Sequence, residues 1–201
     1  MKMNKRRPIK EKHEQFLVDE FIRWWASRTG EQFHVVSRPD RPEAIVQSTS
    51  RTTWIEVTDV FFPLTLAGDL YSHATPGEQH KPMEPGPYSE MDEQMAAIFI
   101  ARLKDKLSKT SYRKACDEHS PGILIVGMQS PWFNGETFEM MRATCRKADW
   151  SSNLGYFSHV FISFRSMNRQ EFEQWDWGQH RVNPVLGGGQ LMIRNGEGGG
   201  E

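Results

Sequence analysis

The sequence predicts an α/β protein, an α+β sandwich in which helices flank a mixed central β-sheet. Segments with helical spacing alternate along the chain with short segments typical of strands. Two strand segments, 122–128 and 157–164, are almost continuously apolar, which is typical of strands buried on both faces. The 201 residues are enough for one domain with a substantial core. We therefore expect a single domain at 11–195, with disordered ends at 1–10 and 196–201.

The first half of the chain is expected to form a helix and then three strands. Residues 11–27 place Leu17, Phe21 and Trp24 on one apolar stripe, and Gly30 follows as a C-terminal stop. Strand patterns come next, at 33–37, 43–47 and 53–62, with a polar turn at 48–51. The third of these patterns is the richest in β-branched and aromatic residues.

The second half is expected to alternate helices with strands. After a loop at 63–87, a long helix is predicted from Tyr88 to about Thr110, with Ser89 as its N-cap. The other expected elements, besides the two apolar strands, are a helix at 135–148, a helix or strand at 171–177 and a strand at 190–194.

Composition excludes several classes of protein. The formal net charge of -1 provides no overall basic field of the kind that indicates a nucleic-acid binder. No apolar run approaches the roughly 20 residues of a membrane span, and no signal-type apolar core follows the N-terminus, so we expect a cytoplasmic protein that does not bind membranes. The 2 cysteines are too few for a disulfide framework or a cysteine-based zinc site.

Positive charge is concentrated near the N-terminus. Residues 2–13 hold several lysines and arginines against a single glutamate. Lys5, Arg6 and Arg7 in this arm are candidate contacts to the phosphates of a nucleic acid. The alternative interpretation is a solvated terminus without a binding role.

Two glutamates lie where apolar residues would serve the strands better. Glu43 begins the second predicted strand and Glu56 lies in the middle of the third. A buried carboxylate costs several kcal/mol unless it is paired or binds a cation. A hairpin between these strands would bring both acids together, with Thr58 on the same face as Glu56. Paired carboxylates are typical ligands of Mg²⁺ or Mn²⁺, which serve phosphodiester hydrolysis.

This arrangement resembles the PD-(D/E)xK nuclease-like superfamily, whose members have a restriction-endonuclease-like αβββαβ core. Pro42-Glu43 corresponds to its "PD" element, Glu56-Val57-Thr58 to its "(D/E)xK" element, and Glu14 to the acid on its opening helix. The order of elements over roughly 11–128 also matches. The resemblance implies that Glu14, Glu43 and Glu56 bind Mg²⁺ or Mn²⁺. Two alternatives stay open, Asp40 as the first acid and Glu20 as the helix acid.

The sequence departs from this superfamily where its catalytic lysine belongs. Thr58 stands there, and a hydroxyl can orient water but carries no charge. The resemblance implies that the lysine can come from the following helix, as Lys106 or Lys109. Both lysines are spaced to share one helix face with Phe99. The alternative is that both belong to a solvated helix edge.

Three functional hypotheses follow. The first is a metal-dependent nuclease that acts on nucleic acid, DNA in preference to RNA, and the resemblance is compatible with a homodimer. The second is a catalytically degenerate protein of the same fold that binds nucleic acid or a protein partner. The third is an unrelated α/β domain whose acids pair with arginines such as Arg38 and Arg41.

Overall fold

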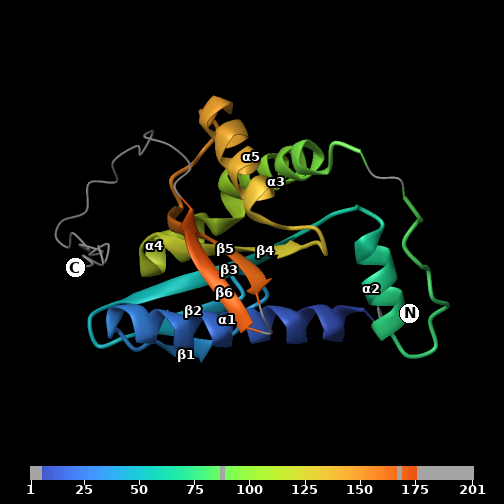
Figure 1. The fold of residues 1–201 in the computed structure, drawn as a ribbon. Helices are drawn as coiled ribbons and strands as arrows, with labels where there is room; N and C mark the ends of the chain where they lie inside the picture. The colour runs from blue at the N-terminus through green and yellow to red at the C-terminus, as the bar shows by residue number, and fades with distance from the viewer. Residues whose placement is uncertain (1–5, 87–88, 167–168, 176–201) are drawn as a thin grey trace, which may run out of the picture.

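A six-stranded mixed sheet flanked by helices forms the protein, which confirms the predicted α/β class. The computed structural model describes residues 6–86, 89–166 and 169–175. Its elements are α1 (Arg7–Thr29), β1 (His34–Ser37), β2 (Ala44–Gln47), β3 (Thr52–Phe61), α2 (Leu66–Ala74), α3 (Met91–Leu107), η1 (Thr110–Tyr112), α4 (Arg113–His119), β4 (Gly122–Gln129), α5 (Gly135–Lys147), β5 (Phe157–Ser166) and β6 (Arg169–Trp175). Figure 1 shows α1 along one face of the sheet, with α3 and α5 over the other.

The strands lie in sequence order across the sheet, from β1 to β6. The pairs β1–β2, β2–β3 and β5–β6 are antiparallel, whereas β3, β4 and β5 run parallel. Strand β2 is short, and its pairing with β3 runs only from Gln47–Thr52 to Ala44–Ile55. Beyond Ile55, β3 continues beside β4 to Phe61. From Glu56 onward, the outer edge of β3 is therefore not paired with β2.

Alternation along β3 divides its side chains between two cores. Ile55 and Val57 join the core beneath α1, whereas Trp54 and Val60 join the core beneath α3 and α5. A fully buried side chain of this size contributes about 1.5–3 kcal/mol through the hydrophobic effect. Both faces of β3 are therefore firmly held, and the alternation places Glu56 on the α3 side.

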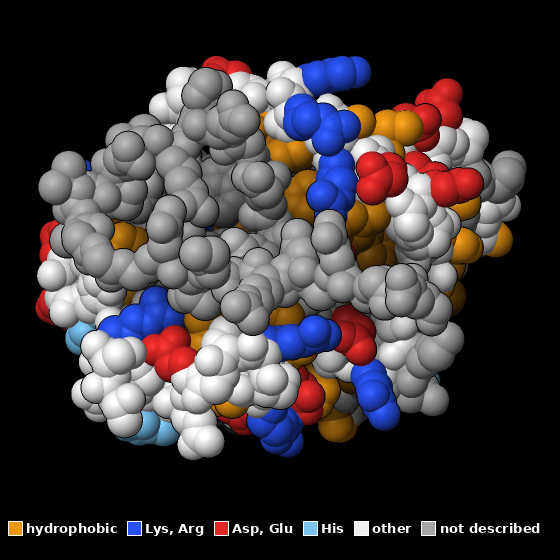
Figure 2. Space-filling view, turned by 60° about the vertical axis from the view of Figure 1, so that its left-hand side comes forward, with side chains coloured by type: hydrophobic (Ala, Val, Ile, Leu, Met, Phe, Trp, Pro, Cys, Tyr) orange, Lys and Arg blue, Asp and Glu red, His pale blue; other side chains and the backbone are white. Residues whose placement is uncertain are grey.

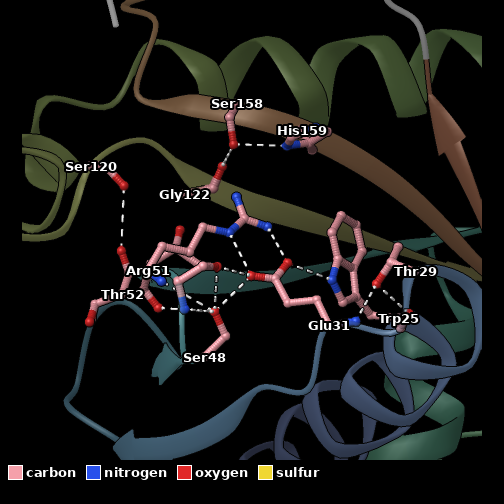
Figure 3. Close-up of polar contacts among 12 residues, drawn as sticks. Trp25, Thr29, Glu31, Ser48, Arg51, Thr52, Ser120, Gly122, Ser158 and His159 are labelled. Atoms are coloured by element: carbon pink, nitrogen blue, oxygen red, sulfur yellow. Dashed lines mark hydrogen bonds and ion pairs between the residues drawn. The ribbon is translucent and has the colours of Figure 1, made fainter. Parts of the chain in front are cut away.

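Glu31 ties the β2–β3 turn to the end of α1 (Figure 3). Its carboxylate accepts hydrogen bonds from Arg51 Nη2 at 3.0 Å, Ser48 Oγ at 2.7 Å and Trp25 Nε1 at 3.0 Å. Partial burial raises the pKa of Glu31, but the hydrogen bonds from Arg51, the serines and Trp25 outweigh it and hold this pKa at about 2. The carboxylate is thus charged at neutral pH, and the cluster fixes the hairpin that carries Glu43 and Glu56.

The structure corrects the predicted start of two helices. Helix α1 begins at Arg7, so Arg7–Lys10 is helical and not part of a disordered arm, because Pro8 in the first turn favours a helix start there. Helix α3 does not begin with Ser89 as its cap. Its N-cap is Glu90, whose φ of 50° is left-handed and whose side chain makes no capping bond.

Two further corrections concern segments that were expected to be irregular or were left undecided. Helix α2 lies within the predicted loop at 63–87, where proline and glycine favoured irregular structure; Tyr71 packs edge-on against Phe61 at 6.0 Å. Residues 171–175 of the undecided segment belong to β6, which pairs with β5 and buries Phe172 and Trp175, while 176–177 lie outside the described residues. Helices η1 and α4 were not predicted at all.

Other predicted elements are confirmed with small shifts at their ends, and Trp54 is fully buried in the core. The predicted strand at 190–194, the tail at 196–201 and residues 1–5 of the basic arm lie outside the described residues. Among the helices that the structure describes, none combines the length and apolar character that crossing a membrane requires.

Candidate functional site

Glu56 is the centre of a buried polar cluster on the α3 side of β3. Its side chain is almost wholly buried. Oxygen Oε1 lies 2.5 Å from Lys106 Nζ and accepts a hydrogen bond from the Tyr112 hydroxyl at 2.8 Å. Oxygen Oε2 is buried and receives no hydrogen bond from the described residues. One oxygen of this carboxylate is thus held by two donors, and the other is left without one.

Glu43 lies beside Glu56, as the sequence predicts. The last pair of the β2–β3 ladder joins Ala44 to Ile55, so one step further places Glu43 opposite Glu56. Burial, followed by the charges of Glu14 and Glu56, raises the pKa of Glu43 to about 7. Lys10 and Lys106 lower it by smaller amounts. Glu43 therefore carries both protonated and charged forms near neutral pH.

Glu14 brings a third carboxylate from α1. Its side chain is buried, and Oε1 lies 2.6 Å from Lys10 Nζ, one turn earlier on the helix. The charge of Glu14 raises the pKa of Glu43, so Glu14 lies near the strand acids, and its part in a metal site stays a prediction. Glu20, the alternative helix acid, pairs with Arg23 on the surface instead. Lys10 was not predicted to take part, although its position four residues before Glu14 favours such a pair.

Of the two candidate lysines, Lys106 reaches the carboxylates. Its side chain is 13% exposed and contacts both Glu56 Oε1 and the Tyr112 hydroxyl. Helix α3 ends at Leu107, so Lys109 lies beyond it, and its Nζ instead pairs with Asp105 at 2.7 Å. Thr58 is buried, on the same strand as Glu56 and two residues beyond it. The lysine lies on α3 and not on β3.

Other predicted site residues lie elsewhere. The Asp40 side chain is 91% exposed and pairs with Arg7 at 2.9 Å, so the structure does not bring it to the carboxylates. Arg7 also pairs with Glu11, and Arg6 pairs with Glu78. Lys5 lies outside the described residues. On the face drawn in Figure 2, basic and acidic side chains are interspersed. Binding of nucleic acid by this arm stays a prediction.

The pairing with arginines that the third hypothesis requires is absent at the carboxylates in the described part of the chain. Arg38 pairs with Asp19 at 2.6 Å and with neither strand acid. The cations that form ion pairs with Glu14 and Glu56 are lysines, Lys10 and Lys106. Arg41 makes no ion pair with these acids among the described residues, although its charge acts on the neighbouring Tyr112 hydroxyl and opposes the rise in its pKa.

Sequence reasoning missed Tyr112. The predicted helix ended at Thr110, whereas the chain continues there as η1 and turns Tyr112 into the core. Burial, and then the charge of Glu56 and the hydrogen bond to it, raises the pKa of the Tyr112 hydroxyl. The hydroxyl keeps its proton and donates a hydrogen bond to Glu56. No local signal in the sequence distinguishes this tyrosine, because its partner is distant along the chain.

The cluster fits a hard divalent cation in its donor chemistry. Carboxylate oxygens are the ligands that Mg²⁺ and Mn²⁺ prefer, and Oε2 of Glu56 has no competing donor among the described residues. The carboxylate of Glu14 lies close enough for its charge to raise the pKa of Glu43. Within the described ranges, however, no three side chains of His, Cys, Asp or Glu are already grouped as ligands. Metal binding would therefore draw these carboxylates closer together.

A second polar cluster lies on the opposite face of β3. Asp59 Oδ1 lies 3.1 Å from His13 Nε2 and accepts a hydrogen bond from Gln129 Nε2 at 3.2 Å. The hydrogen bond to Asp59 raises the pKa of His13, against the opposing effect of burial. The sequence correctly separates Asp59 from Glu56, because side chains alternate along a strand and residues three positions apart point to opposite faces.

Comparison of the chain with protein-family models, with curated proteins and with solved structures finds no match in any of the three.

Proposed function

We propose that this chain is a metal-dependent nuclease that hydrolyses phosphodiester bonds of nucleic acid, DNA in preference to RNA. Glu14, Glu43 and Glu56 would hold Mg²⁺ or Mn²⁺. One observation carries the proposal: the pKa of Glu43 is raised to about 7 by burial and by the charges of Glu14 and Glu56. Carboxylates gathered in this way repel one another, and a divalent cation relieves the repulsion.

Each residue of the cluster has a chemical task in this proposal. A bound metal ion supplies an activated water and offsets charge on the phosphate. Lys106, whose Nζ lies 2.5 Å from Glu56 Oε1, would supply an ammonium group to stabilise the negative charge that develops on the phosphate. Thr58 can orient water through its hydroxyl. Lys106 would thus replace the lysine that the strand lacks.

Three narrower statements accompany the proposal. A restriction-endonuclease-like core is supported by the sequence motifs and by the order α1, β1, β2, β3, α3 and β4, with α2, η1 and α4 as additional helices between β3 and β4. The cytoplasmic location and the homodimer are predictions from the sequence and from the resemblance.

Calorimetric titration with Mn²⁺ tests the proposal directly. Glu56→Gln keeps the shape of the side chain and removes its charge, so Mn²⁺ binding and metal-dependent cleavage of duplex DNA should both be lost. Glu139→Gln is the matched control, because Glu139 is an exposed glutamate whose single ion-pair partner among the described residues is Arg142. It should bind and cleave as wild type does. Cleavage that persists in Glu56→Gln would refute the proposal. Parallel assays on single-stranded DNA and RNA establish the preferred nucleic acid.

A second candidate function is a non-cleaving protein of this fold that binds nucleic acid or a protein partner. Two observations favour it, the threonine at position 58 and the ion pair by which Lys106 neutralises Glu56 without metal. This candidate predicts metal-independent binding of nucleic acid in a mobility-shift assay and no cleavage by any variant. Cleavage that disappears in Lys106→Met would exclude it.

A further inference from the structure

The hydroxyl of Tyr112 joins the two charged groups of the cluster. It lies 2.8 Å from Glu56 Oε1 and 3.2 Å from Lys106 Nζ. An ammonium group can only donate hydrogen bonds, so the hydroxyl accepts from Lys106 and donates to Glu56. Tyr112 is thus a bridge between a cation from α3 and an anion from β3.

The ring of Tyr112 is held rigidly. It stacks on Trp54 with centroids 5.5 Å apart and meets the edge of Phe157 at 5.1 Å. The indole of Trp54 is itself anchored, because its Nε1 donates to the Ser120 carbonyl at 2.9 Å. Only 1% of Tyr112 is exposed. The position of its hydroxyl is therefore set by packing and not by the charged groups that it contacts.

Both donors act on the same oxygen of Glu56. Lys106 and Tyr112 contact Oε1, whereas Oε2 is buried and receives no hydrogen bond from the described residues. A buried carboxylate oxygen without a donor is costly, and rotation of the carboxylate would otherwise share the donors between its two oxygens. The tyrosine, with its fixed direction, opposes that rotation.

We propose that Tyr112 is a positioning residue, which holds Glu56 Oε1 and Lys106 Nζ together so that Glu56 presents Oε2 to a divalent cation. The identity of the cation rests on the proposed function, but the positioning of the two side chains does not. A purely structural role would require only the ring, which phenylalanine supplies equally well.

The first arm of the test uses the full chain without metal. Nitrogen-15 NMR of the lysine side chains compares wild type with Tyr112→Phe, which keeps the aromatic stack. Loss of one acceptor should speed hydrogen exchange of the Lys106 ammonium group about 10-fold. Tyr156→Phe is the matched control, because the Tyr156 hydroxyl accepts from Arg113 at 3.2 Å and contacts no charged group of the cluster. Unchanged exchange in Tyr112→Phe would overturn the inference, whether or not metal binds.

The second arm is a calorimetric titration of the same three proteins with Mn²⁺ alone. Loss of a residue that hydrogen-bonds a metal ligand typically weakens metal affinity by about 10-fold or more. Tyr112→Phe should therefore bind Mn²⁺ about 10-fold more weakly than Tyr156→Phe and wild type. Equal affinities would overturn the claim that Tyr112 presents Oε2 to a cation. Wild type that binds no Mn²⁺ refutes the proposed metal site instead, and faster Lys106 exchange then still supports the positioning role.

Discussion

Removal of the Lys106 ammonium group should leave Glu56 as a buried, unpaired charge. The two groups are 2.5 Å apart, with the side chains 13% and 3% exposed. At this distance and an effective dielectric constant of about 20, their gross attraction is about 7 kcal/mol. Desolvation of the two ions offsets much of this attraction. Removal of one partner leaves the other buried, desolvated and without a counter-charge. Such removals typically lower the free energy of unfolding by about 3–5 kcal/mol.

We therefore expect Lys106→Met to lower the free energy of unfolding by about 3 kcal/mol, the lower end of that range because Tyr112 still donates to Glu56. Urea unfolding at pH 7, followed by tryptophan fluorescence, measures the change. Lys109→Met is the matched control: it removes a lysine three residues further along, which pairs with the exposed Asp105, and should change stability by less than about 0.5 kcal/mol.

Two further measurements separate this reasoning from general damage to the core. Adding Glu56→Gln to Lys106→Met removes the unpaired charge, so the double variant should be more stable than Lys106→Met alone. If Mn²⁺ occupies the site, it should stabilise Lys106→Met by about 2.7 kcal/mol at 100 times its Kd. Stability of Lys106→Met within about 0.5 kcal/mol of wild type would refute the reasoning.

Three other predictions test the surroundings of the site. The pKa of Glu43 is raised to about 7, so protonated Glu43 is favoured in the folded state, and stability should fall as pH rises from about 4.5 through 7. Glu43→Gln should then stabilise the protein by about 1–2 kcal/mol at pH 8 in urea unfolding and flatten this pH dependence; an unaltered pH profile contradicts the prediction. Glu31 has the opposite effect on the pH dependence of stability. Because its pKa is lowered to about 2, it contributes stability that is fully present above about pH 4.5 and is lost as the pH falls through about 2. Glu31→Gln should cost about 1–2 kcal/mol at pH 7, reduced by solvent screening of its partly exposed pair with Arg51. A difference in stability between wild type and Glu31→Gln that is as large at pH 2.5 as at pH 7 argues against it. Gly122→Ala would place a methyl group 2.3 Å from the Trp54 ring, so thermal melting should show a loss of about 1–3 kcal/mol, and an unchanged melting temperature counts against this packing.

Local patterns were enough to predict the strands that carry the site. The apolar alternation of 53–62 identified β3, and the period of two correctly placed Glu56 and Asp59 on opposite faces. The polar turn at 48–51 predicted the hairpin, whose register brings Glu43 to Glu56. These inferences succeeded because they depend on residues that are near one another in the sequence.

Local patterns failed where packing between distant segments decides the outcome. Helix α2 forms despite the proline and glycine that indicated a loop, and it places Tyr71 against Phe61. The choice between Lys106 and Lys109 also required the structure, because both fit one helix face and only the docking of α3 on the sheet brings one of them to Glu56.

The acids of the site and the sheet that carries two of them can be read from the chain, because strand period and hairpin spacing are local properties. The direction in which each hydrogen-bond donor points toward these acids cannot be read from the chain. Tyr112 and Glu56 are 56 positions apart, and their contact at 2.8 Å arises only when the tyrosine ring packs on Trp54 beneath α3. Tertiary packing therefore decided which oxygen of Glu56 is held by protein donors and which one receives none from the described residues, because close packing fixes directions that spacing along the chain leaves open.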